Sequence, residues 1–178
     1  MKLIPLALLL SLAPIAEASP LLTVQRVNYK PEKGLVYELV FNKETCQINV
    51  AAPFEVYYRD NRSKQRLPDF SSDSRDYFGP RLDAAKITPT QAALEFKAFD
   101  EIQKETGVRA EILARLDNSS GECLASAEIT YGNQRYTLEH IDIKVTKFLG
   151  FPNGVEWVQL KGINAEGPVV DCVVGKCN

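Results

Sequence analysis

The sequence predicts an all-β fold, an antiparallel β-sandwich of roughly eight to ten strands, with a closed β-barrel as the second choice. Three observations support this prediction. Apolar and polar residues alternate with a period of two, most clearly from Val108 to Leu116. Turn-forming residues separate the short apolar runs, and four cysteines are available to tie them together. At most one short helix is expected.

The first half of the chain contains three predicted strands, at Leu22–Val27, Leu35–Asn42 and Phe54–Arg59. The second and third are rich in aromatic and β-branched residues, which is typical of strands that pack on both faces. The turn between the first two is predicted at residues 31–34, which contain Pro31 and Gly34.

The second half contains a longer series of predicted strands, at Val108–Leu116, Glu122–Tyr131, Leu138–Val145, Val155–Leu160 and Pro168–Val174. Short turn signals at residues 117–121 and 132–133 predict antiparallel hairpins from Val108 through Val145. Thr90–Thr106 is ambiguous, because helix formers lie between Pro89 and Gly107 while Leu94, Phe96 and Ala98 alternate with charged residues. A strand at Ala93–Phe99 followed by a short helical turn is favoured.

Residues 1–18 have the layout of a secretory signal peptide: Lys2, an apolar run from Leu3 to Leu12, and the small-residue site Ala16-Glu17-Ala18. The apolar run is too short to span a bilayer, so no transmembrane segment is expected. The first cysteine is Cys46, so no lipid anchor is expected either. Residues 19–178 are then a single β-rich domain, exported to the periplasm or the medium, with a long loop at residues 61–90.

The four cysteines, Cys46, Cys123, Cys172 and Cys177, all lie in the exported part. An even count in an exported chain indicates disulfides, and three pairings are open. Cys46–Cys123 and Cys172–Cys177 is the preferred pairing. The spacing of the last two cysteines does not fit a redox motif, and a chain with one histidine does not fit a zinc site.

The charge balance argues against a nucleic-acid partner. The chain has 21 Lys and Arg against 23 Asp and Glu, a net charge of −2 at pH 7, so no basic excess exists to neutralise phosphates. No cofactor motif is found, and no cofactor or metal is expected. Acidic residues of the long loop do not have the spacing of a calcium loop; these are Asp69, Asp73, Asp76 and Asp83.

Two clusters offer candidate chemistry. His140 and Asp142 lie two residues apart on a predicted strand, so they share a face and fit a hydrolase, although no nucleophile motif accompanies them. The densest basic run, Arg59 to Arg66, is flanked by aromatic residues and fits an anionic or saccharide ligand. The alternative for this run is a solvated hairpin tip. The predicted binding residues are Arg59, Arg62, Arg66, Tyr77 and Arg81.

Several short motifs carry a family resemblance: VQR at Val24–Arg26, VYE at Val36–Glu38, PFEVYY at Pro53–Tyr58, YFG at Tyr77–Gly79, and the pair Gly162 and Gly167. Together they resemble an exported bacterial family classed as a domain of unknown function. Tyr58 stands where that family typically has tryptophan. The resemblance implies an exported β-rich fold and assigns no site.

The sequence therefore predicts an exported, non-catalytic binding or interaction domain of the bacterial cell envelope, whose partner is an envelope component or a protein. Three alternatives stay open: a periplasmic hydrolase using His140 and Asp142, a carrier of small apolar ligands, and an inhibitor or immunity-type protein.

Overall fold

The computed structural model describes residues 16–68, 75, 78–97, 100, 103–104, 111–131 and 134–177. Outside these ranges lie the first 15 residues of the predicted signal peptide, Tyr77, and the start of the predicted strand Val108–Leu116. Ala16, Glu17 and Ala18 belong to the first strand and pair with Asn42, Phe41 and Val40.

Eight strands overlap the runs predicted from the sequence, although β1, β8 and β9 are longer than predicted: β1 (Ala16–Arg26), β2 (Lys33–Asn42), β4 (Phe54–Asp60), β6 (Ile112–Asp117), β7 (Leu124–Tyr131), β8 (Gln134–Phe148), β9 (Phe151–Asn164) and β10 (Gly167–Val174). Two short strands are added, β3 (Gln47–Ile48) and β5 (Gln91–Leu94), together with the 3-10 turn η1 (Ala84–Lys86). β5 begins two residues earlier than the predicted strand Ala93–Phe99, and Lys97 and Asp100 beyond it are helical.

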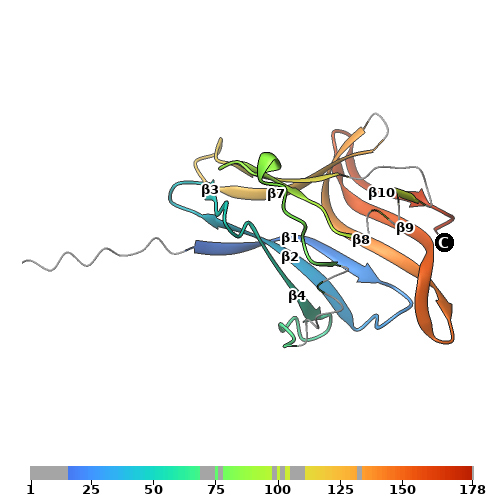
Figure 1. The fold of residues 1–178 in the computed structure, drawn as a ribbon. Coiled ribbons are helices and arrows are strands. Elements are labelled where there is room, and N and C mark those ends of the chain that lie inside the picture. The colour runs from blue at the N-terminus through green and yellow to red at the C-terminus, as the bar shows by residue number, and fades with distance from the viewer. Residues whose placement is uncertain are drawn as a thin grey trace, which may run out of the picture.

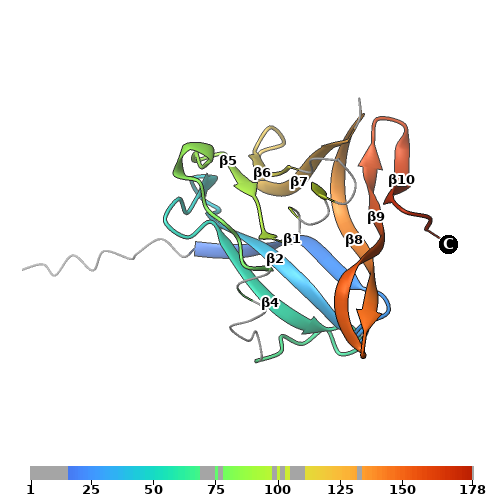
Figure 2. The ribbon, with the colours of Figure 1, turned by 45° about the vertical axis from the view of Figure 1, so that its right-hand side comes forward.

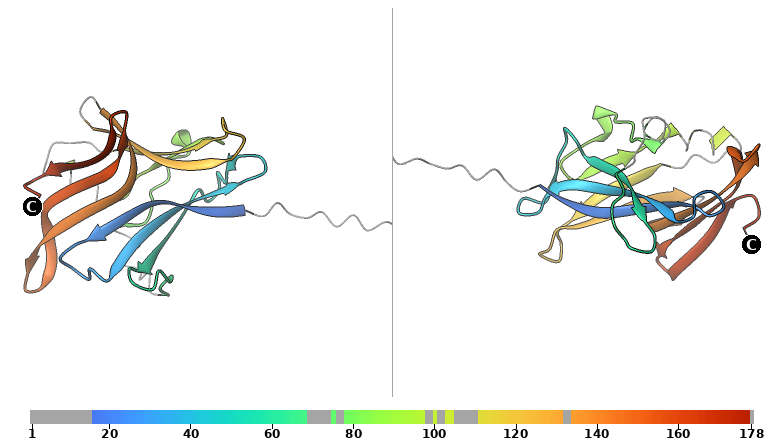
Figure 3. Two further views of the ribbon diagram at one scale, coloured as in Figure 1. Left: turned by 180° about the vertical axis from the view of Figure 1, so that it is seen from behind. Right: turned by 90° about the horizontal axis from the view of Figure 1, so that it is seen from below.

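All ten strands belong to one mixed sheet that curls into a nearly closed barrel (Figures 1 and 2). The all-β class is confirmed, but the first-choice sandwich of two separate sheets is replaced by the second-choice barrel. The reason is β8, which is 15 residues long. One edge of β8 pairs with β9, and the other pairs first with β7 and then, in parallel, with β1. One strand therefore joins both halves of the sheet (Figure 3).

The two ends of the sheet approach each other where β3 meets the segment before β5. The backbone N–H of Ile48 donates to the carbonyl of Pro89 over 2.7 Å. Beside this bond, the disulfide Cys46–Cys123 links the turn before β3 to the start of β7, with Cα atoms 5.4 Å apart. The predicted pairing of the cysteines is confirmed.

A β-bulge in β8 decides which residues face outward. Leu138 pairs with Gly162 and His140 pairs with Lys161, so Glu139 is an extra residue without a partner on β9. Because side chains alternate along a strand, this extra residue lets Leu138 and Ile141 both face the apolar interior. His140 and Asp142 consequently face the outside of the barrel.

The interior is filled by aromatic and aliphatic side chains. Tyr37 and Phe96 are fully buried and stack with ring centroids 5.3 Å apart, and the Tyr37 hydroxyl donates to the carbonyl of Phe78 over 2.8 Å. Burial raises the pKa of Tyr37 well above its ordinary value. This stacking joins β2 to the segment after β5 inside the barrel.

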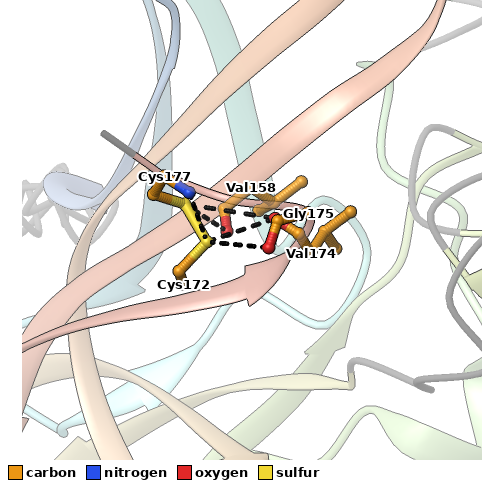
Figure 4. The surroundings of a disulfide bond; sticks show 5 residues. All are labelled: Val158, Cys172, Val174, Gly175 and Cys177. Carbon is orange, nitrogen blue, oxygen red and sulfur yellow. Dashed lines mark hydrogen bonds between the residues drawn. A yellow bond between two sulfur atoms is a disulfide. The ribbon is translucent and has the colours of Figure 1, made fainter.

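The second disulfide holds the C-terminal segment on β9 (Figure 4). Cys172 and Cys177 are five residues apart, and the Sγ atom of Cys177 lies 3.5 Å from the carbonyl oxygen of Val158. Gly175, with φ of 64°, makes the turn between them. Two disulfides fit an oxidising compartment. Within the described ranges, no helix has the length and apolar character needed to cross a bilayer.

Candidate functional site

The basic run predicted as a binding site folds back on the edge of β4. The backbone N–H of Leu67 donates to the carbonyl of Tyr58 over 2.8 Å, and Arg59 pairs with Arg66 in an isolated β-bridge. The turn between them is held by Asp60, whose carboxylate accepts bonds from the backbone N–H groups of Arg62 and Ser63. These bonds lower the pKa of Asp60.

The predicted binding residues are only partly brought together. Arg59 and Arg66 lie side by side, and Arg62 is exposed at the turn a few residues away. Arg81 instead pairs with Glu95 beyond β5 and forms a two-bond ion pair with Asp100, at 2.6 and 2.9 Å. Tyr77 lies outside the described residues. The site is therefore smaller than the prediction and is centred on β4.

Arg66 sits over the ring of Tyr57 at the mouth of a surface cavity. Its guanidinium carbon is 4.4 Å from the ring centroid, and its Nη2 is 2.5 Å from a carboxylate oxygen of Glu55. The hydrogen bond to Glu55 raises the pKa of Arg66. The cavity has a volume of about 330 Å³ and is lined by Val56, Tyr57, Arg66, Leu67, Pro68 and Arg75. This volume is at the lower end of the range for small-ligand pockets.

Arg59 has no acidic partner among the described residues. Its Nη2 lies 3.5 Å from the hydroxyl of Thr23, and its buried Nε has no hydrogen-bond partner there. Buried polar groups are nearly always paired, and a guanidinium is well suited to bind an anionic group, so Arg59 is a candidate ligand-binding residue within the described part of the chain.

A second polar cluster continues the outer face across β1 to β8 and β9. His140 Nε2 lies 2.8 Å from one carboxylate oxygen of Asp142, and Lys161 Nζ lies 2.5 Å from the other. The side chain of Asp142 is only 9% exposed, against 31% for His140 and 41% for Lys161. The predicted neighbourhood of His140 and Asp142 is confirmed, whereas Lys161 was missed because it comes from another strand.

Thr23 connects the two clusters, since it is the cross-strand neighbour of His140 on β1 and the contact of Arg59. Next to it, the amide of Gln25 accepts a bond from Asn61 over 2.6 Å and donates to the carbonyl of Pro31 over 2.9 Å. Gln25 and Asp142 are cross-strand neighbours, and both are nearly buried. Each of these two buried polar groups therefore has partners.

This second cluster lacks the parts of a hydrolytic triad within the described chain. No hydroxyl group there is hydrogen-bonded to His140, and the second oxygen of Asp142 is occupied by Lys161. A metal is not favoured either, because the described residues contain no group of three His, Cys, Asp or Glu side chains placed to bind one. The cluster acts as an ion-pair network that joins β8 to β9.

A further charged cavity lies over β6, β7 and β8, with a volume of about 380 Å³. Arg115 Nε is 2.7 Å from Glu128, and Arg135 forms an ion pair with the same carboxylate oxygen. No local pattern predicted this cavity, because its arginines lie on separate strands and come together only through the strand register.

Tyr57 gives the β4 site a pH dependence. Burial, followed by the hydrogen bond to Glu38 over 2.6 Å, raises the pKa of Tyr57 from 10.0 to about 12. The folded state holds this proton more tightly than the unfolded chain, so the resulting stability is present below pH 10 and is lost as the pH rises towards 12.

We expect the free energy of unfolding of the wild type to fall relative to that of Tyr57→Phe across this interval, when both are measured by urea unfolding at stepped pH. A difference that stays constant from pH 10 to pH 12 would contradict the assigned pKa.

Comparison of the chain with protein-family models, with curated proteins and with solved structures finds no match.

Proposed function

We propose that the protein is an exported, non-catalytic binding domain of the bacterial cell envelope that recognises an anionic saccharide at the β4 site. One observation carries the proposal: Arg59 and Arg66 lie side by side at the strand edge, and Arg59 has no acidic partner among the described residues. Planar guanidinium groups bind carboxylates through paired hydrogen bonds, and an aromatic ring such as that of Tyr57 suits the face of a sugar. Export follows from the predicted signal peptide and agrees with the two disulfides.

Binding of oligogalacturonate, a chain of hexuronic acids, tests the proposal by isothermal titration calorimetry. We expect Arg59→Gln and Arg66→Gln each to weaken binding by about 10-fold or more, because each removes charge-assisted hydrogen bonds. A neutral glucan of similar length should bind far more weakly than the charged chain.

The matched control is Arg135→Gln in the second charged cavity, over β6, β7 and β8. Arg135 resembles Arg66 in exposure, 57% against 54%, and each forms an ion pair with one glutamate. Arg135→Gln should leave binding unchanged. Equal losses in all three variants would show nonspecific attraction to basic side chains, and the absence of any binding by the wild type would reject the saccharide assignment.

The second candidate function is a periplasmic hydrolase, which the bond between His140 and Asp142 favours. It requires a hydroxyl nucleophile to approach Nδ1 of His140, the ring nitrogen that does not contact Asp142. A hydrolytic activity on envelope glycans that is abolished by His140→Gln, and unaffected by Arg66→Gln, would support this function over the binding domain.

A further inference from the structure

The β8–β9 hairpin ends in large apolar side chains that project from the barrel. Phe148, Leu149 and Phe151 are 66%, 82% and 70% exposed. Phe148 pairs with Phe151, and Leu149 and Gly150 form the two-residue turn between them. In Figures 1 and 2 this hairpin reaches beyond the neighbouring β1–β2 turn at the lower end of the molecule. A soluble domain rarely places three such side chains together in water.

The backbone of this two-residue turn is strained at Leu149. Leu149 has φ of 50° and Gly150 has φ of 84°, the left-handed backbone of the commonest hairpin turn. Asn, Asp and Gly adopt this backbone readily, whereas a leucine there is disfavoured by roughly 1 kcal/mol. An apolar residue kept at a strained and exposed position points to a role in binding.

Positive charge surrounds the base of the hairpin. The ring of Tyr29 in the β1–β2 turn has three cations within 6 Å of its centroid: Arg26 at 5.0 Å, Lys30 at 5.5 Å and Lys147 at 5.8 Å. None of the three forms an ion pair with a described carboxylate, although the whole chain has a net charge of −2.

The basic surface continues to the turn after β4. The backbone N–H of Asn61 donates to the carbonyl of Glu32 over 2.8 Å, which fixes that turn beside the β1–β2 turn. Arg62 and Lys64 are exposed in the turn after β4. This turn and the β1–β2 turn lie at the same end of the barrel (Figure 1). Basic side chains thus lie on both sides of the β1–β2 turn.

The hairpin is held in place before any partner binds. Asn28 of the β1–β2 turn donates to the carbonyl of Val145 over 2.7 Å and accepts from the backbone N–H of the same residue over 3.0 Å. Lys147 also donates to the carbonyl of Asn28. A rigid tip loses little conformational entropy on binding, so more of the apolar burial contributes to affinity.

We propose that this end of the barrel docks on an anionic phospholipid bilayer, with Phe148, Leu149 and Phe151 inserted at the boundary between headgroups and acyl chains. The apolar side chains lie at the tip of the hairpin, and the basic Lys147 lies one residue behind them. This arrangement matches a bilayer surface, where the apolar acyl chains lie beneath the charged headgroups. Anionic headgroups supply the acidic partners that Lys30 and Lys147 lack within the described residues. The proposal goes beyond the saccharide site and does not depend on it.

Co-sedimentation of the purified exported protein with vesicles tests this proposal. Vesicles of equal parts phosphatidylglycerol and phosphatidylcholine should bind the wild type, and vesicles of phosphatidylcholine alone should bind it much more weakly. Leu149→Asn should lower the partition coefficient by about 10-fold, because it removes the inserted side chain. Asparagine suits the left-handed turn, so this variant keeps the fold.

The contribution of the basic side chains to vesicle binding is tested with separate variants. Lys30→Gln and Lys147→Gln should each weaken binding to the anionic vesicles by about fivefold, with a reduced dependence on salt. Val170→Asn, at a 60% exposed apolar residue on β10, is the matched control and should bind as the wild type does. Arg66→Gln should also be unaffected, which separates this proposal from the saccharide site.

Wild-type protein that fails to bind anionic vesicles would overturn the proposal and leave the tip to a protein partner. Leu149→Asn bound as tightly as the wild type would overturn it as well.

Discussion

Replacement of both Cys46 and Cys123 by serine is expected to lower the free energy of unfolding by about 4–5 kcal/mol. The two cysteines are separated by 77 residues, so the bridge removes a large loop-closure entropy from the unfolded chain. The bridge also lies beside the hydrogen bond from Ile48 to Pro89, where the two ends of the sheet approach one another. Urea unfolding under non-reducing conditions, followed by circular dichroism, measures the loss.

The shorter bridge provides the control. Cys172 and Cys177 are five positions apart, so their bridge removes much less loop-closure entropy from the unfolded chain. Replacing both by serine is expected to lower the free energy of unfolding by only about 2 kcal/mol. The two losses should therefore differ by roughly a factor of two. Equal losses would show that the long bridge does not act through the entropy of the unfolded chain.

Gly162→Ala is expected to destabilise the fold by about 3 kcal/mol, because strand β9 lies too close to β8 at this position for a side chain. A Cβ atom at Gly162 would lie less than 3.0 Å from the carbonyl oxygen of Thr137 and 3.1 Å from the Cα of Leu138. Both neighbours are backbone atoms next to the bulge at Glu139, so the strands themselves would have to separate. Thermal and urea unfolding measure this change.

Gly34→Ala is the comparison for this variant. A Cβ atom at Gly34 would meet Oδ1 of Asn61 at 2.8 Å, which is the end of a side chain that can rotate away. The expected loss is about 1 kcal/mol, from the hydrogen bonds that Asn61 gives to Gln25 and Pro31. Similar losses in both variants would contradict the backbone origin of the larger effect.

The strands were predictable because their signal is local. Alternation identified β6, β8 and β9, and aromatic and β-branched composition identified β2 and β4. β3 was missed because two residues carry no period. The position predicted for β5 was shifted because Thr90–Thr106 contains both helical and strand patterns. Pairing with β6 selects the strand only at Gln91–Leu94.

The candidate site was predictable only in part, for a related reason. The basic run and the spacing of His140 and Asp142 are visible along the chain, and both pairs of neighbours are found together. Lys161, Thr23 and Gln25 join them through pairing across β1, β8 and β9, which no short window of sequence contains. Arg81 was assigned to the site from its position in the chain, but Asp100 and Glu95 hold it elsewhere.

The sequence by itself determined the all-β class and most strand positions, because these follow from residue type and spacing over a few residues. It left three cysteine pairings, and the structure selects the preferred one. The tertiary structure decided that the strands form one nearly closed barrel and not two packed sheets, since this depends on β8 pairing with β1, β7 and β9 at once. It also decided which polar residues meet on the outer face. Pairing between distant strands is set by register and by bulges such as Glu139, and these are properties of the whole sheet.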